Sequence, residues 1–421
     1  MAGSATRLCG LALALMLAGC GGRATGVFIP IASAPPGATS VDILVATTRA
    51  RDERPGELFS GERGREMAFA NIVVSIPPDA NRKVGDVQWA PQLPPDPSKS
   101  FATLKVEQLD RDGAIHQLNT MVAQHKPRRV MVFVHGYNNR FDDAVYRFAQ
   151  IVHDSQAPVA PVLFTWPSRA SLLAYGYDRE SSTYSRDALE GMLGFLADDP
   201  NVDEVSVLAH SMGNWVTMEA LRQMAIRRGS IPRKISAVMM AAPDVDIDVF
   251  RTQIRAIPEP RPQFTLFVST DDKALAMSKR VWGSTARLGA IDPSVEPYKT
   301  ALAEANLAVV DMSKIETEDK LGHGKFAESP EVVRLIGTRL AEGQTISDMK
   351  VGIGDHIANI ATSTGTAVGA TAGLVLAAPV AVVDSATREN YTARVYEVVP
   401  AGDGTPRKKK PGEEDRPAPD K

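Results

Sequence analysis

A serine at residue 211 stands where a buried strand is predicted to turn directly into a helix. The segment reads Val205-Ser206-Val207-Leu208-Ala209-His210-Ser211-Met212-Gly213-Asn214. Small residues on both sides of Ser211 permit a turn so sharp that its hydroxyl projects above the edge of a sheet. A serine presented in this way can attack an acyl carbonyl when a nearby base takes its proton. The structural alternative is a serine that caps the N-terminus of the helix.

This spacing resembles the nucleophile elbow of α/β-hydrolases, which is written G-x-S-x-G. The first small position is Ala209 and not glycine, a departure that adds only a methyl group to the turn. A five-residue pattern arises by chance, but one set between a strand and a helix is far more specific. We therefore predict that Ser211 is a nucleophile.

A second motif, Val132-Phe133-Val134-His135-Gly136-Tyr137, is a strand that ends in His-Gly. In hydrolases of this fold, the residue after that His-Gly lends its backbone N–H to the oxyanion hole. By this resemblance, the N–H groups of Tyr137 and Met212 are expected to hold the negative oxygen of a tetrahedral intermediate. His135 itself is expected to be structural, because the base of this fold comes last in the chain.

The triad of this fold runs in the order serine, acid, histidine. Of the seven histidines, only His323 and His356 follow the strand predicted at Phe264. His323 lies in a glycine-flanked loop after the last predicted strand, where an imidazole should reach Ser211. His356 lies beyond the domain and is the alternative.

Two carboxylates, Asp271 and Asp272, come just past a predicted strand in Phe267-Val268-Ser269-Thr270-Asp271-Asp272. One of them should orient the imidazole and stabilise its cation. Asp244 also follows a strand, but one strand earlier. We expect Asp244 to cap the helix that starts near Asp246.

The elements that must position these residues alternate between strands and helices from Arg129 onward. Continuous apolar runs predict buried strands at 130–134, 159–165, 205–208, 235–240, 264–268 and 307–310, and helical spacing occurs at 141–153, 184–196 and 215–226. Such runs between helices indicate a mostly parallel central sheet that is covered on both faces. Alternating residues at 41–47 and 67–76 predict an N-terminal β extension, so the fold class is α/β, of the α/β-hydrolase type.

The chain resembles a bacterial family of α/β-hydrolases described as esterase/lipase-superfamily proteins of uncharacterised function. The matching pieces are Val41 to Arg49, Val132 to Asn139, Phe164 to Ser168, Tyr177 to Glu180, Ala209 to Gly213, Ala241 to Asp246 and Ser269 to Leu275. The family pattern has its Asp immediately before a basic-Ala-Leu stretch, which implies Asp272 as the acid. We expect Trp166, Tyr177 and Arg179 to line the pocket, and core packing is an equal alternative for Trp166 and Tyr177. Neither a cysteine-based metal site nor a phosphate loop is visible in the sequence, and we expect no cofactor and no metal.

The N-terminus predicts export and lipid attachment. Arg7 and the apolar stretch Leu8 to Ala18 form a signal peptide that is too short to span a bilayer. Leu17-Ala18-Gly19-Cys20 resembles the lipobox of bacterial lipoproteins, in which the thiol of Cys20 accepts a diacylglycerol. The residue after Cys20 is Gly21 and not the Asp that retains such proteins at the inner membrane, which favours the periplasmic face of the outer membrane.

Domain boundaries follow from these patterns. We expect a signal peptide at 1–19, a flexible Gly/Ala/Pro-rich tether at 20–39 and a hydrolase domain at 40–345. Residues 346–388 form a Gly/Ala-rich apolar segment, in which helical spacing places Gly365, Gly369 and Gly373 on one helix face. We expect the apolar part of this segment, 366–383, to pack as a hairpin on the domain surface. A contact with the membrane is the alternative. Residues 389–421 are charged and expected to be disordered.

Together these patterns predict a lipid-anchored serine hydrolase of the bacterial envelope that cleaves small-molecule or lipid carboxylic esters. A formal net charge of −3 gives no reason to expect nucleic acid as a partner. Two alternatives stay open at this point. One is a lipid-anchored binding or scaffold protein that keeps the fold without turnover, and the other is an acyltransferase or amidase that uses the same triad.

Overall fold

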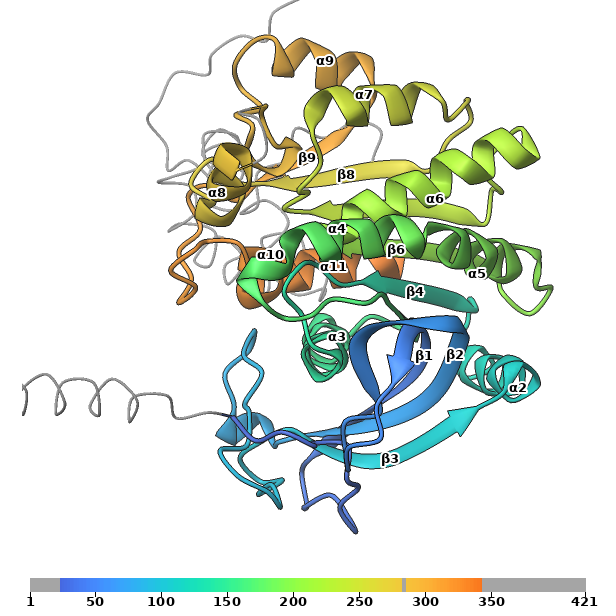
Figure 1. Ribbon diagram of the computed structural model, residues 1–421, viewed down its shortest axis with the longest axis vertical. Coiled ribbons are helices and arrows are strands. Elements are labelled where there is room, and N and C mark those ends of the chain that lie inside the picture. The colour runs from blue at the N-terminus through green and yellow to red at the C-terminus, as the bar shows by residue number, and fades with distance from the viewer. Residues whose placement is uncertain (1–22, 282–284, 343–421) are drawn as a thin grey trace, which may run out of the picture. The chain divides into compact units, whose positions relative to one another are not determined.

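In the computed structural model, one nine-stranded sheet organises residues 23–281 and 285–342, which are the residues that the structure describes. Its strands are β1 (Thr39–Arg51), β2 (Phe59–Ile76), β3 (Ala102–Leu109), β4 (Arg129–Val134), β5 (Ala160–Thr165), β6 (Glu204–His210), β7 (Ile235–Ala241), β8 (Gln263–Val268) and β9 (Ala308–Asp311). The spatial order is β3-β2-β1-β5-β4-β6-β7-β8-β9. Figure 1 shows the blue N-terminal strands at one end of this sheet and the orange β9 at the other.

The sheet is parallel from β1 and β5 through β9, and only the pairs β1–β2 and β2–β3 are antiparallel. The predicted N-terminal β extension is therefore part of the same sheet and not a separate layer. Because parallel strands end at the same edge, the loops after β4, β6, β8 and β9 gather the predicted site residues at one edge.

Helices cover both faces of the sheet, as the sequence predicts. They are α2 (Arg111–Val122), α3 (Phe141–Ser155), α4 (Tyr175–Tyr184), α5 (Arg186–Asp198), α6 (Gly213–Arg228), α7 (Ile247–Arg255), α8 (Lys273–Val281), α9 (Tyr298–Glu304), α10 (Lys325–Glu328) and α11 (Pro330–Glu342), with 3-10 turns η1 (Asp79–Asn81), η2 (Leu172–Ala174) and η3 (Leu288–Ala290). One buried cluster joins α2, α5, α6 and α7 to the sheet. A second cluster joins α3, α10 and α11 to the opposite face. Apolar residues of each parallel strand divide between these clusters, which explains their continuous apolar runs.

The segment that we expected to be a flexible tether is packed onto the domain from Arg23 onward. Val27 and Phe28 are buried, and the ring of Phe28 lies 5.2 Å from that of Phe141. The guanidinium of Arg23 lies 3.8 Å from the centre of the Trp89 ring, and Arg23 also pairs with carboxylates at the start of α3. The abundance of Gly, Ala and Pro misled the prediction, because two large apolar side chains and one arginine are enough to fix the segment.

Several predicted segments fall on residues that the structure does not describe. These are the signal peptide with Cys20, the alternative base His356, the apolar stretch 366–383 and the charged tail. Within 23–281 and 285–342, no helix is long and apolar enough to cross a membrane.

Candidate active site

Ser211 occupies a strained turn between β6 and α6. Its φ angle is 52°, in the left-handed region that residues with a side chain rarely adopt. Its N–H donates to the carbonyl oxygen of Ala241 at 2.9 Å, and its own carbonyl oxygen accepts from the N–H of Asp244 at 3.2 Å. Bonds to the end of β7 and to the loop that follows it thus hold the strained conformation in place, as a nucleophile elbow requires.

The side chain of Asn214 is a further support of this turn that sequence reasoning missed. It is fully buried, and its amide nitrogen donates to the carbonyl oxygens of Ala209, Ser211 and Ala241 at 3.1 to 3.2 Å. One amide therefore joins the end of β6, the elbow and the end of β7. A polar residue at the start of an apolar helical stretch was the available signal.

Two glycines let the loop after β4 approach the elbow closely. A Cβ atom on Gly136 would lie 2.8 Å from the Cβ of Ser211, and one on Gly213 would lie 2.4 Å from the carbonyl oxygen of His135. Tyr137 and Met212 follow directly after Gly136 and Ser211. Neither backbone N–H donates to another of the residues that the structure describes. Two free donors beside the serine match what an oxyanion hole needs.

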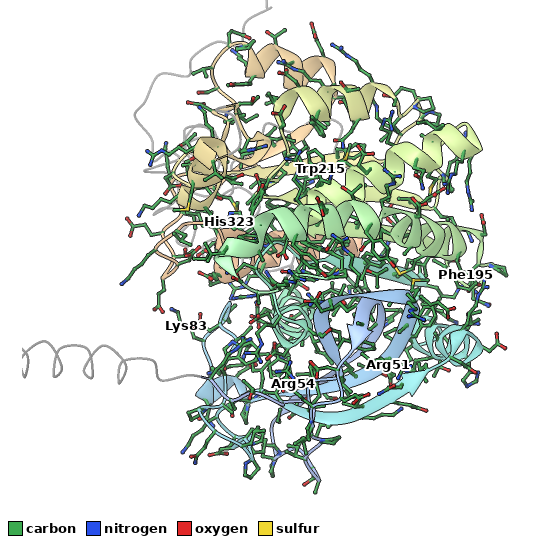
Figure 2. All side chains as sticks on the ribbon, in the orientation of Figure 1. Arg51, Arg54, Lys83, Phe195, Trp215 and His323 are labelled. Carbon is green, nitrogen blue, oxygen red and sulfur yellow. The ribbon has the colours of Figure 1, made fainter. Side chains whose placement is uncertain are left out.

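His323 lies against Asp272 at the same edge of the sheet. The distance from His323 Nδ1 to Asp272 Oδ2 is 2.7 Å, and the Asp272 side chain is fully buried. The second oxygen of Asp272 accepts from the N–H of Leu275 at 2.9 Å, at the start of α8. In Figure 2, His323 lies on the side of the molecule that carries α8 and α10.

The loop that carries His323 is held by a carboxylate that the sequence did not single out. Asp319 accepts from the N–H groups of His323 and Gly324 at 2.6 and 2.9 Å. The carbonyl oxygen of His323 accepts from His210 Nε2 at 3.2 Å, and the two imidazole rings lie 4.8 Å apart. Because His210 directly precedes Ser211, this contact connects the histidine loop to the elbow. Among the described residues, nothing bonds to His323 Nε2.

Asp271 faces away from the imidazole. Both of its oxygens accept from the buried Nζ of Lys325, at 2.7 and 2.9 Å, and its side chain is 54% exposed. Burial raises the pKa of Asp271, but the hydrogen bonds from Lys325 and Ser269 outweigh it, and the net pKa is lowered. Of the two carboxylates that the sequence proposed, Asp272 is thus the one that the structure brings to His323.

The surroundings of the site shift the pKa values of His323 and His210 in opposite directions. Burial lowers the pKa of His323, but the hydrogen bond and charge of Asp272, with the charges of Asp244 and Asp319, raise it above the ordinary 6.5. Burial and the charge of His323 hold the pKa of His210 well below 6.5. The neutral form is thus favoured at His210, and the protonated form is favoured at His323.

His135 is part of a buried support beneath the site. Its ring stacks on Trp166, with centroids 4.9 Å apart, and its Nε2 accepts from the N–H of Trp166 at 3.1 Å. Burial, and secondarily the charge of Arg49, lower the pKa of His135 to about 3, so it stays neutral. Trp166 is fully buried and packs in the core, the second of the two placements that the sequence allowed.

Arg49 is another residue whose position the sequence did not explain. Its buried guanidinium donates to the carbonyl oxygens of Ser60 and Ser168 at 3.1 Å and of Asn139 at 2.9 Å. One side chain thus ties the end of β1 to the loops after β4 and β5. The only local signal of this role in the sequence was an arginine near the end of an apolar strand.

The other two residues proposed to line a pocket, Tyr177 and Arg179, each take part in a cation–π contact. Tyr177 stacks under the guanidinium of Arg169 at 3.6 Å, and Arg179 lies 4.7 Å above the Trp215 ring on α6. Between them, Asp178 is fully buried and accepts from Ser168 Oγ and from the N–H of Arg169.

The expectation that Asp244 caps a helix is wrong. Asp246 caps α7, because its carboxylate accepts from the N–H groups of Asp248 and Val249. Asp244 instead accepts from Tyr175 Oη at 2.8 Å and from Ser278 Oγ at 2.7 Å. The sequence could not separate two carboxylates only two residues apart, since the local turn decides which of them faces the helix.

The fold and the elbow define the protein as an α/β-hydrolase. The chain belongs to the family described as alpha/beta hydrolase of unknown function (DUF900), whose model matches residues 110–339. It is also similar to an uncharacterized protein of Nostoc sp., with 24% identity over 131 residues. That match covers 25% of this chain and 34% of the relative, so it spans about a third of the relative's length. Neither description gives a substrate.

Proposed function

We propose that the protein is a serine hydrolase that cleaves carboxylic esters through an acyl-enzyme. Ser211 is the nucleophile, His323 the general base and Asp272 the acid that orients it. The N–H groups of Tyr137 and Met212 form the oxyanion hole. The observation that carries the proposal is the 2.7 Å contact between His323 and the buried Asp272, at the edge of the sheet where Ser211 sits in its strained turn.

The acylation step uses each of these groups at a stated atom. Asp272 accepts a hydrogen bond from the N–H of His323 Nδ1, which leaves the lone pair of Nε2 free to take the Ser211 hydroxyl proton. Ser211 Oγ then bonds to the acyl carbon, and the carbonyl oxygen becomes an anion between the N–H groups of Tyr137 and Met212. When this intermediate collapses, the alcohol leaves with the proton from Nε2, and the acyl group stays on Ser211.

Deacylation repeats the sequence with water as the nucleophile. His323 Nε2 takes a proton from the water, whose oxygen bonds to the acyl carbon. The second tetrahedral intermediate collapses, the acid leaves, and Ser211 Oγ regains the proton from His323. The raised pKa of His323 favours its cationic form in both intermediates.

A small cavity lies next to three segments of the proposed site, and none of the five residues proposed for the reaction lines it. It has a volume of about 250 Å³ and is lined in part by Asn138, His210 and Gly324. These residues belong to the loop after the predicted oxyanion donor, to the elbow and to the histidine loop.

The test of the nucleophile is Ser211→Ala in the purified protein. We expect the loss of labelling by a fluorophosphonate probe and a fall in turnover of p-nitrophenyl esters of about 10⁶-fold, since a triad serine acts as a unit with its base. The melting temperature should change by only a few degrees, because one hydroxyl is lost. Ser236→Ala, a serine on β7 that bonds Glu204, is the matched control and should leave labelling intact. Retained turnover in Ser211→Ala removes the assignment.

We also propose that the mature protein is anchored in the bacterial envelope through lipidated Cys20, at the outer membrane. The proposal rests on the lipobox-like Leu17-Ala18-Gly19-Cys20. Cys20→Ser should abolish metabolic labelling with palmitate and processing by the lipoprotein route. Labelling that survives this change contradicts the proposal, whereas Cys9→Ser is the matched control and should still be labelled.

A further inference from the structure

A large cavity lies away from Ser211, on the N-terminal half of the sheet. It has a volume of about 1140 Å³ and opens between β1 and β2 on one side and helices α2 and α5 on the other. Its walls include none of the five residues proposed for the reaction. In Figure 2, Arg51 and Phe195 mark two parts of its lining, contributed by β1 and α5.

The floor of this cavity is apolar. The side chains that form it come from two strands and two helices: Leu44, Met67, Phe69, Leu118, Met192 and Phe195. Met67, Phe69 and Phe195 are only partly buried, although each packs against the core cluster on this face. Apolar surface that is left open in this way favours the binding of an apolar group.

The rim of the cavity is strongly basic. Five arginines line the cavity, against the two carboxylates Glu66 and Asp110. Arg51, Arg65 and Arg111 are exposed, and none of the three has an ion pair or side-chain hydrogen bond with another described residue. Asp110 already caps α2, where it accepts from the N–H of Gly113 at 2.8 Å. The cavity therefore has a surplus of unpaired guanidinium groups.

We propose that this cavity binds an anionic amphiphile, with its chain on the apolar floor and its carboxylate or phosphate among the arginines. Guanidinium groups suit both kinds of head because they donate two parallel hydrogen bonds. A phosphate without a chain leaves the floor uncovered, and a neutral lipid leaves the arginines unpaired. The proposal concerns binding only and does not rest on the proposed reaction at Ser211.

A glycine on α5 provides a way to fill the cavity without disturbing the core. Gly191 lines the cavity, and a Cβ atom there would meet no atom within 4 Å. Gly176 on α4 also has open space around it and does not line the cavity, so it is the matched control. Replacing either helical glycine by phenylalanine should not destabilise the protein, because glycine is a poor helix former.

The experiment uses the full chain with Ser211→Ala, so that no probe is turned over. The probe is cis-parinaric acid, whose fluorescence rises in an apolar site, and its methyl ester is the uncharged counterpart. We expect saturable binding of the acid at one site and clearly weaker binding of the methyl ester. Gly191→Phe should weaken binding at least tenfold, and Gly176→Phe should leave it unchanged. Replacing Arg51 and Arg65 together by glutamine should weaken binding of the acid roughly three- to tenfold, the range for two exposed charge pairs.

Three results overturn the proposal. The first is the absence of saturable binding by the full chain. The second is equal binding to Gly191→Phe and Gly176→Phe, which places the ligand elsewhere. The third is equal affinity for the acid and its methyl ester, which removes the arginines from recognition. Each outcome is separate from the labelling of Ser211 by a fluorophosphonate, so failure here leaves the proposed reaction untouched.

Discussion

At the scale of single residues, the pair Asp271 and Asp272 shows how one position decides chemistry. The two carboxylates are neighbours in the chain, yet one is buried against His323 and the other is exposed and held by Lys325. In the loop after β8, the side chain of Asp271 contacts Lys325 and that of Asp272 contacts His323. The sequence alone left both open, and only the resemblance to a family favoured Asp272.

The different surroundings of Asp271 and Asp272 lead to a prediction about the pH dependence of turnover. A base must be neutral, so kcat/KM should fall as the pH drops through the pKa of His323, which lies above 6.5. In Asp272→Asn the hydrogen bond and charge that raise this pKa are lost while burial remains. The acid limb of the pH profile should therefore move to lower pH, and kcat should drop by on the order of 10⁴-fold.

Asp271→Asn is the control for that measurement. Its carboxylate touches Lys325 and Ser269 and not the imidazole, so both the acid limb and kcat should stay near those of the parent protein. The two pH profiles, recorded with p-nitrophenyl esters, decide the matter. A larger loss in Asp271→Asn than in Asp272→Asn reverses the assignment.

At the scale of elements, the elbow and the loop after β4 work as one unit because two glycines bring them into contact. Gly213 lies under the carbonyl oxygens of Val134 and His135, where a Cβ atom would be 2.5 and 2.4 Å away. Gly213→Ala must push the start of α6 away from β4. We expect a loss of about 1–3 kcal/mol in the free energy of unfolding, the usual cost of overpacking a core, and a loss of turnover.

The control is an alanine where glycine has room. Gly176→Ala on α4 meets no atom within 4 Å and should raise the free energy of unfolding by up to about 1 kcal/mol, because alanine is the better helix former. Urea denaturation measures both changes. Equal effects of the two substitutions count against the close packing described for Gly213.

The elements themselves could be predicted where their patterns are strong. The apolar runs that become β4 to β9 and the helical spacing of α3, α5 and α6 are visible in the sequence, because buried strands and amphipathic helices leave local signals. The strand β3 was not predicted, although apolar and charged residues alternate from Leu104 to Glu107 in the manner of a half-buried strand. The supports at Arg49, Asn214 and Asp319 were not predicted either, because their partners are carbonyl and N–H groups whose positions depend on the turns around them.

At the scale of the whole molecule, the N-terminal segment is a structural part of the domain. Phe28 is 4% exposed and lies against Phe141 and Tyr146, whereas the next residue, Ile29, is 52% exposed. We expect Phe28→Ala to lower the free energy of unfolding by about 3–5 kcal/mol, the usual cost for a buried phenylalanine. Ile29→Ala should change it by less than about 0.5 kcal/mol. If chemical denaturation shows similarly small effects of both changes, the segment is a flexible tether and not a structural part of the domain.

The packed segment also limits how far the hydrolase can reach from its proposed anchor. Two glycines separate Cys20 from Arg23, the first described residue. Three Cα–Cα steps of about 3.8 Å therefore allow at most about 11 Å between Cys20 and Arg23. A protein whose lipidated residue is so close to its folded domain stays at the surface of the bilayer that holds the lipid. Under the proposed anchoring, we expect its substrates to come to that surface or to belong to it already.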